Sequence, residues 1–269
     1  MSNKDYNSHI NMMLFIFLSK TYKQTLRIFS IGLLFLFFFT THSVLAGPLL
    51  PAQMDQSKMK KVLKVLGPAT SSTPLSSPYP LGGWEGFEVG ISKHYLPWSY
   101  LSEVDQTVGD QKDLDFHLLT IGKGLFYNFD LFLSIIPIIK SEALNYFSTQ
   151  LRYQFWASEN RIFYLSGIFF AGTSTINNQL NMQNNGLDFL GTITLDRVSI
   201  FLGIGRLFST GRFIGGASGI TASQATETER LTLSHQLVGI EWPIGNFFIA
   251  AEADRYTIPY YSIKLGYRQ

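Results

Sequence analysis

From Trp84 onward, the chain consists of segments in which apolar and polar side chains alternate with a period of two. This period places one set of side chains on each face of a β-strand. Ten such segments occur, at 84–96, 114–123, 129–139, 144–155, 161–172, 186–195, 197–208, 230–242, 246–254 and 259–268. Most exceed the roughly five or six residues of an ordinary strand and match strands that cross a bilayer at a tilt. The pattern predicts an all-β fold of long strands.

The connections between these segments give a second indication. The three longest, 97–113, 173–185 and 209–229, are the first, fifth and seventh in order. All are odd, so in an up-and-down sheet they open at the same end. Outer-membrane barrels combine short periplasmic turns with longer outside loops. We therefore predict an up-and-down antiparallel transmembrane β-barrel over 84–269, with about ten strands (a range of 8 to 12) and both barrel termini periplasmic.

Composition excludes several other classes. The chain is 46% hydrophobic and 15% charged, which can bury a core and argues against disorder. It has no Cys, so a disulfide scaffold and a thiolate metal site are excluded. A formal charge of +2 gives no electrostatic case for nucleic acid as a partner. The Gly-rich stretch 203–216 lacks the following helix that a phosphate cradle needs. We expect no cofactor and no metal.

Residues 1–46 have the order of a secretory signal peptide. Lys20, Lys23 and Arg27 precede an apolar run, Ile28–Phe39, and a small-residue cleavage site follows at Ala46-Gly47. The run is about 12 residues, short of the roughly 20 that a spanning helix needs. We predict export by a cleavable signal peptide, with an uncleaved anchor over 28–45 as the alternative. The leader holds four bases and one acid, so the remaining chain has a formal charge of −1.

Residues 47–83 are rich in Pro, Ser and Gly and are predicted to be a periplasmic linker. Within them, 56–66 has apolar residues at helical spacing and Lys residues elsewhere, and Gly67-Pro68 would end the helix. This amphipathic helix could lie on a membrane surface or enter a barrel mouth. A plain spacer helix is the favoured alternative.

The side chains opposite the apolar stripe are expected to face the lumen. We predict a polar network in the lumen made of Glu88, Asp115, His117, Lys123, Arg152, Asp188, Glu252 and Lys264. Small residues such as Gly203 and Ser262 lie on the same stripe and suit a confined interior. Four Trp fall at predicted strand ends, where an amphipathic indole is favoured, and form a predicted aromatic girdle: Trp84, Trp98, Trp156 and Trp242.

The region 84–269 resembles the small outer-membrane β-barrels of Gram-negative bacteria. The most specific match is the last strand, in which Tyr261, Ile263, Leu265 and Tyr267 alternate with polar residues. The resemblance implies that this strand is the C-terminal signal read by the barrel-assembly machinery. It also implies outer-membrane localisation, with outer-membrane lipid as a partner. Ten strands leave a lumen largely filled by side chains, so we expect a structural or narrow-pore role, with small polar solutes as the possible cargo.

Two other functions stay open at this point. One is an outer-membrane lipid hydrolase or acyltransferase, using a His from among His94, His117 and His235, with Asp115 or the Glu252–Asp254 pair nearby. Ser234 and His235 are adjacent and would point to opposite faces of a strand, and a lumen network explains these residues without catalysis. The other is a soluble periplasmic lipocalin-like binder with its apolar stripe inside.

The apolar residues of 231–242 change from one face of the predicted strand to the other near His235. A bulge near His235 is one explanation for this change.

Overall fold

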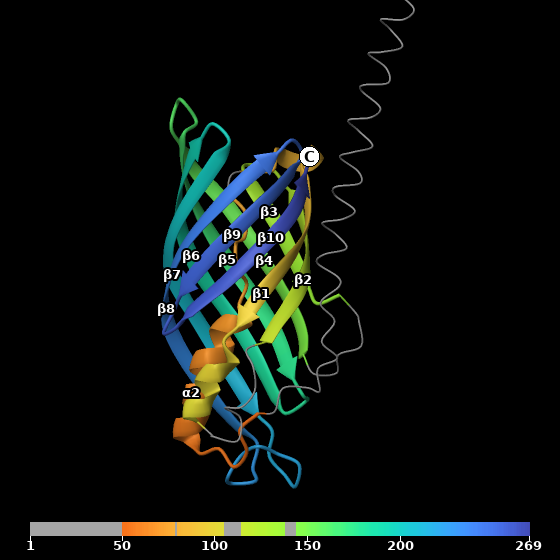
Figure 1. Ribbon diagram of the computed structural model, residues 1–269, viewed down its shortest axis with the longest axis vertical. Coiled ribbons are helices and arrows are strands. Elements are labelled where there is room, and N and C mark those ends of the chain that lie inside the picture. Colours follow the sequence, from red (N-terminus) through yellow and green to blue (C-terminus); the bar gives the residue numbers. More distant parts are fainter. Residues whose placement is uncertain (1–49, 79, 105–113, 138–143) are drawn as a thin grey trace, which may run out of the picture. The chain divides into compact units, whose positions relative to one another are not determined.

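The computed structural model describes residues 50–269 apart from 79, 105–113 and 138–143. The predicted signal peptide lies outside these residues and stays a prediction. The described chain forms a closed antiparallel barrel of ten strands, which confirms the predicted fold class (Figure 1). The strands are β1 (Phe87–Leu96), β2 (Leu114–Gly124), β3 (Phe129–Ile135), β4 (Leu144–Ala157), β5 (Phe163–Ile176), β6 (Leu180–Leu195), β7 (Val198–Phe213), β8 (Glu227–Ile244), β9 (Phe247–Arg255) and β10 (Pro259–Arg268).

Each strand pairs with its neighbours in sequence, and the first and last strands close the barrel. β1 and β10 pair from Glu88 and Arg268 to Tyr95 and Tyr261. Closure pairs β1 with β10, so the sheet has no free edge strand, which is a condition for any sheet that crosses hydrocarbon. Among the described residues, no helix is both long and apolar enough to span a membrane.

The two ends of the barrel differ. At one end, called the turn end here, lie the connections 125–128, 158–162, 196–197 and 245–246 and the C-terminus. Asn128, Asp196 and Gly245 have positive φ angles, as tight reversals require. The opposite end, called the loop end, carries the connections 97–113, 136–143, 177–179, 214–226 and 256–258. The long odd-numbered connections 97–113 and 214–226 therefore open together, as predicted.

One of the predicted long loops is wrong. Most of 173–185 is strand, because β5 runs to Ile176 and β6 starts at Leu180. Only 177–179 turn, with Asn177 and Asn178 at positive φ. The strands stay hydrogen-bonded here, but their outward residues become polar. The sequence therefore lacks the alternation of apolar and polar residues by which the strands were predicted. The hairpins at the loop end therefore extend beyond the apolar part of the barrel.

The outward face carries a belt of exposed apolar side chains. Its members include Val89, Ile121, Leu131, Leu133, Phe147, Leu151, Phe169, Leu187, Phe189, Leu202, Ile204, Val238, Ile240 and Ile263. On β8 the outward residues change from Ile240 and Val238 to Gln236, Ser234 and Thr232. β7 and β8 pair in unbroken register through this point, so a bulge at His235 is not the reason. The change of face marks the edge of the apolar belt.

Inward-facing glycines make room for phenylalanine rings. Four Gly–Phe pairs are direct cross-strand partners: Gly122 with Phe132, Gly186 with Phe170, Gly239 with Phe201 and Gly266 with Phe248. A Cβ built on Gly239 would lie 2.0 Å from the Phe201 ring. These small residues do suit a confined interior, but aromatic rings occupy the space that they leave.

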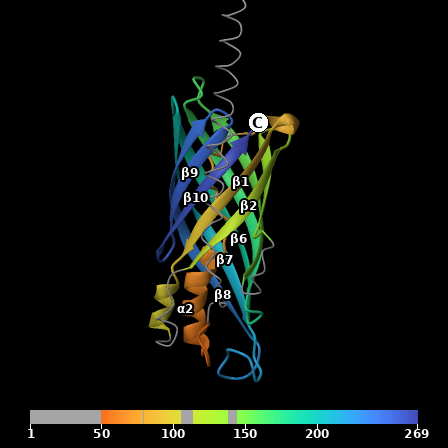
Figure 2. The same ribbon diagram turned by 45° about the vertical axis from the view of Figure 1, so that its right-hand side comes forward.

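The helix α2 (Gln56–Ala69) packs at the loop end (Figure 2). The Asp55 side chain caps its start by accepting a hydrogen bond from the Lys58 N–H at 2.8 Å. The predicted stop at Gly67-Pro68 is wrong, since the helix continues through both residues to Ala69. Its apolar side chains Met59, Val62, Leu63 and Leu66 are buried. They belong to one cluster with residues of the barrel and its loops: Trp98, Leu101, Ile176, Leu180, Phe213, Ile220 and Tyr260. The helix therefore covers this mouth of the barrel, one of the two functional alternatives to a plain spacer.

Candidate functional site

Residues 70–78 and 80–82, which we call the lumen strap, lie in the barrel interior between α2 and the short 3₁₀ helix η1 (Gly83–Glu85). Thr70, Ser72 and Ser76 are buried in it. Pro74, Pro78 and Pro80 keep the strap extended and out of any strand ladder. Its backbone polar groups, buried without a paired strand, must find partners on lumen side chains.

Carboxylates of the lumen accept hydrogen bonds from the N–H groups of the strap. Glu252 accepts from the Leu75 N–H at 2.7 Å, and Glu241 accepts from the Ser77 N–H at 2.8 Å. Both carboxyl groups are buried. Each of these bonds satisfies a backbone donor that would otherwise be buried without a partner. The inward acids of β8 and β9 are therefore ligands for the chain's own backbone.

Donors on β4 complete the cradle from the opposite wall. The Arg152 guanidinium donates to the Pro74 carbonyl at 2.5 Å and to the Ser76 hydroxyl at 2.7 Å. Gln150 donates to the Thr73 carbonyl at 2.6 Å and accepts from Arg152 through its own oxygen. Anions and cations on facing walls thus hold opposite edges of one extended peptide.

The contacts progress steadily along the barrel. Tyr146, near the loop end of β4, donates to the Ser71 carbonyl at 3.1 Å. Arg152, six residues nearer the turn end, binds Pro74 and Ser76. At the far end of the strap, Asp130 on β3 accepts from the Leu81 N–H at 3.2 Å. The strap therefore runs through the lumen from the loop end to the turn end.

A compact ion cluster lies near the turn end. Lys264 donates to Glu88 at 2.6 Å, and Arg268 donates to the other Glu88 oxygen at 2.7 Å. Arg268 also bridges to Glu241 at 3.0 Å. Glu88 is completely buried, and two cations compensate its charge. Because Glu241 also binds the strap, this cluster joins the closing strands β1 and β10 to the lumen contents.

A second cluster is centred on His235. Its Nδ1 lies 2.8 Å from Asp188 and its Nε2 lies 2.8 Å from Asp254. An imidazole that donates to both carboxylates must carry two ring protons, so the geometry fits an imidazolium between two anions. The Tyr256 ring stacks on it with centroids 4.2 Å apart. Burial raises the pKa of Tyr256 well above its ordinary value, so its hydroxyl is neutral beside Ser71.

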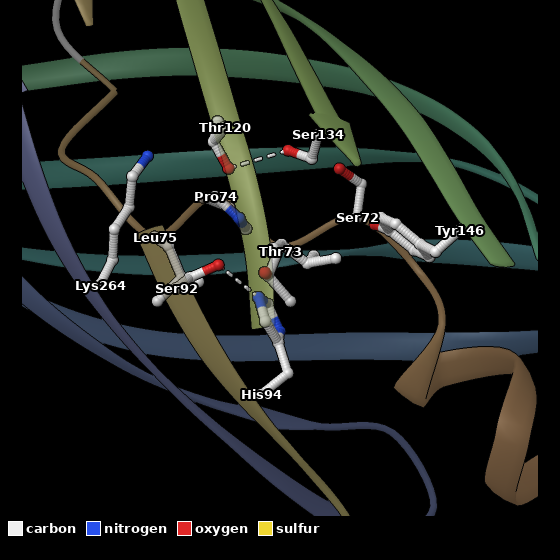
Figure 3. A pocket seen from close by; sticks show the side chains of 11 residues that line it. Ser72, Thr73, Pro74, Leu75, Ser92, His94, Thr120, Ser134, Tyr146 and Lys264 are labelled. Carbon is white, nitrogen blue, oxygen red and sulfur yellow. Dashed lines mark hydrogen bonds between the residues drawn. The ribbon is translucent and has the colours of Figure 1, made fainter. Parts of the chain in front are cut away.

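A small cavity lies between the strap and the strands β1, β2, β3, β4 and β10 (Figure 3). His94 bonds Ser92 at 2.8 Å through one nitrogen and Ser262 at 3.0 Å through the other. Neither nitrogen is oriented by a carboxylate, as an activated serine nucleophile would need. The space holds about one water molecule, and strap residues Thr73 and Leu75 line it. This pocket has no room for a lipid or peptide substrate.

The predicted network is partly assembled. Its five members inside the lumen are Glu88, Arg152, Asp188, Glu252 and Lys264, all buried. The assignments of Asp115, His117 and Lys123 are wrong. They alternate with the inward Leu118 and Thr120 and so lie on the outer face.

The error on β2 has a clear origin. Leu118 and Leu119 are adjacent apolar residues, so hydrophobicity alone does not fix which face of this strand points inward. On the outer face, Asp115 forms an ion pair with Lys93, and Lys123 donates to the Trp84 carbonyl. His117 lies opposite Lys93 in the register. These groups therefore belong to the outer surface of β1 and β2.

Sequence reasoning missed several lumen residues. They are Gln150, Glu241 and Arg268, together with the strap that Gln150 and Glu241 contact. Glu241 could have been predicted to face the lumen, because alternation along β8 places it on the same face as Gly239 and His235. Nothing in the local sequence indicates that a Pro-rich linker is the partner of these groups. Among the described residues, no His, Asp and Glu cluster is arranged to hold a metal ion.

Three of the four predicted girdle residues lie at the turn end and are exposed. These are Trp84, Trp156 and Trp242. Trp98 is wrongly assigned, because it is completely buried beneath α2 in the apolar cluster at the loop end. In β10, Tyr261 and Ile263 point outward and are exposed, while Ser262 and Lys264 are buried. The recognition of this strand by the assembly machinery stays a prediction.

No family model and no curated protein sequence matches the chain. Solved structures with a similar fold include the N-terminal β-barrel domain of Pseudomonas aeruginosa OprF, which is 13% identical over 70% of this chain and 99% of that chain, with a TM-score of 0.32. The KdgM porin is 12% identical over 67% of this chain and 98% of that chain, with a TM-score of 0.35. Ail of Yersinia pestis is 14% identical over 68% of this chain and 97% of that chain, with a TM-score of 0.27. At these values the likeness concerns the β-barrel fold alone.

Proposed function

We propose that this protein is an integral outer-membrane β-barrel with a structural role, whose lumen is sealed by its own strap and which has no catalytic function. Outer-membrane lipid and the barrel-assembly machinery are its proposed partners, and the predicted signal peptide would direct its export. The observation that carries the proposal is the inversion of polarity across the barrel wall. A belt of exposed large apolar side chains lies on the outer face, whereas the lumen holds buried charged side chains beside its phenylalanine rings.

The cost of burial supports lipid on the outside. A soluble barrel would expose Phe169, Phe189 and Ile204 to water while it buries Glu88 and Lys264. Exposed apolar patches of this extent are unfavourable in monomeric soluble proteins. In a bilayer, the same side chains contact acyl chains. The lipocalin-like alternative requires an apolar cavity for a ligand, whereas polar groups and the strap occupy the lumen here.

The contents of the lumen favour a sealed barrel over a narrow pore. The strap is bonded to both walls, α2 covers the loop end, and the space beside His94 holds about one water molecule. We therefore do not propose that the barrel transports small polar solutes. The same crowding argues against a hydrolase or acyltransferase, because the space beside His94 holds about one water molecule and His235 lies between two aspartates under the Tyr256 ring.

Conductance across a planar bilayer tests the sealed state. The mature protein, with heat-modifiable gel mobility as proof of folding, should give no steady open-channel current. A variant that lacks 50–82 should conduct if it retains the folded gel mobility, because its polar lumen would fill with water. Steady open-channel conductance by the full mature protein contradicts the sealed state. Recovery of the protein in the soluble periplasmic fraction contradicts the membrane location.

A further inference from the structure

The two ends of the described chain lie at opposite ends of the barrel. The C-terminal residue Gln269 pairs with Phe87 at the turn end, where its N–H donates to the Phe87 carbonyl at 3.0 Å. Met54 lies at the loop end, where it bridges Thr221 in the connection between β7 and β8. A chain that follows an ordinary up-and-down course would enter and leave on one side. Here, the residues before β1 cross the barrel one additional time.

The additional crossing takes place inside the lumen. Asn184, near the loop end of β6, donates to the Gly67 and Thr70 carbonyls at 3.1 Å. Ser166, near the turn end of β5, donates to the Pro78 carbonyl at 2.6 Å. The strap between these points is extended, so it spans the lumen from one mouth of the barrel to the other. The ten strands thus enclose an eleventh passage of the same chain.

The orientation of the barrel follows from its two rims. The turn end has short reversals, as expected of a periplasmic rim, and its exposed Trp84, Trp156 and Trp242 mark it as a membrane interface. At the loop end, β8 and its neighbours continue past the apolar belt, with polar residues on their outer faces. Long hairpins and polar protruding strands are typical of the cell exterior in outer-membrane barrels.

The chain before α2 is fixed at that outer rim. Met54 donates its N–H to the Ile220 carbonyl at 2.8 Å and accepts from the Ala222 N–H at 2.9 Å. Leu63 and Leu66 of α2 are completely buried on the apolar face of the helix. The exposed Lys61 and Lys64 lie on the opposite face of α2. Both the bridge and the helix hold the segment outside the lumen mouth.

We infer that the barrel carries its own N-terminal segment across the outer membrane and presents the residues before α2, with the lysine face of α2, at the cell exterior. The inference rests on the proposed function, since it needs an outer-membrane barrel. Its structural basis is the lumen strap, which connects Met54 at the exterior end of the barrel to the start of β1 at the periplasmic end. The barrel then serves as both anchor and conduit for a surface-presented segment.

The absence of cysteine from the chain makes a direct test available. Three single-cysteine variants place a thiol at exposed positions: Gln53→Cys before α2, Ala217→Cys in the loop at the loop end and Asn246→Cys in a turn at the turn end. Intact cells are treated with a membrane-impermeant polyethylene-glycol maleimide, and labelling is measured as a gel shift. We expect shifts for Gln53→Cys and Ala217→Cys in intact cells, and for Asn246→Cys only after the outer membrane is permeabilised.

Each other outcome has a distinct meaning. If Ala217→Cys is labelled in intact cells and Gln53→Cys only after permeabilisation, the inference is overturned while the outer-membrane barrel stands. If Asn246→Cys is labelled in intact cells and the other two are not, the orientation is reversed and the inference fails. If no variant is labelled until the cells are permeabilised, the proposed function fails with it. Heat-modifiable mobility of each variant verifies that the barrel is folded.

Discussion

The pairing of Gly239 with Phe201 predicts a strong dependence on side-chain size inside the barrel. In Gly239→Val, the new Cβ would lie 2.0 Å from the Phe201 ring, so the ring must move within a filled lumen. Overpacking of this kind costs about 1–3 kcal/mol. Urea unfolding in detergent should show a lower midpoint. Gly167→Val is the matched control, because a Cβ at Gly167 meets no described atom within 4 Å; an equal loss in both variants would contradict the argument.

Arg152 is the residue whose loss should loosen the strap most. It donates to Pro74 and Ser76, and its guanidinium lies 3.8 Å from the centre of the Phe132 ring. In Arg152→Met, the strap carbonyls lose a charged donor, and we expect a destabilisation of about 2 kcal/mol. Hydrogen exchange of 70–78 should accelerate. Arg206→Met, on the outer face of β7, should leave this exchange unchanged, and similar exchange in both variants would exclude the proposed role of Arg152.

At the level of elements, α2 is the part of the cap that can be tested alone. Leu63 is completely buried in its apolar face. Leu63→Ala should cost about 2–5 kcal/mol of local packing, and it should expose the helix to proteolysis at Lys60 and Lys61 without loss of the barrel. Lys64→Ala removes an exposed side chain of the same helix and serves as the control. Unchanged cleavage of Leu63→Ala would mean that α2 does not depend on this contact.

The strands could be located from the sequence wherever lipid contact forces apolar residues outward. Their ends at the loop end could not, because beyond the belt polar residues such as Asn181 and Gln183 continue the ladder without an apolar signal. The inward face of β2 was lost for a related reason, since Leu118 and Leu119 are both apolar. The strap was least accessible to prediction. Its partner Glu252 is 177 residues from Leu75 in sequence, and local pattern describes only a Pro-rich linker.

At the scale of the whole molecule, the apolar belt and the polar lumen together give each kind of side chain a favourable environment. In the bilayer, the wall contributes the hydrophobic contact outside, and the lumen pairs its acids and bases inside. The strap adds hydrogen-bonding backbone where side chains alone would leave Glu241 and Glu252 with fewer donors. A ten-stranded barrel is thereby filled by polar contacts and the strap, together with phenylalanine rings and a small apolar cluster of Ile168, Leu190, Phe201 and Leu237.

The position of the belt predicts how one charge acts at two places on one strand. Ile240 and Thr232 both point outward from β8, but Ile240 lies inside the apolar belt and Thr232 lies beyond it. A Lys on the lipid face costs about 2–4 kcal/mol at the membrane midplane and nearly nothing outside the hydrocarbon. Ile240→Lys should therefore reduce the fraction that refolds into lipid vesicles, measured by gel shift, whereas Thr232→Lys should refold like the parent protein. Equal refolding of the two variants would mean that this face does not contact lipid, because water solvates a lysine equally well at both positions.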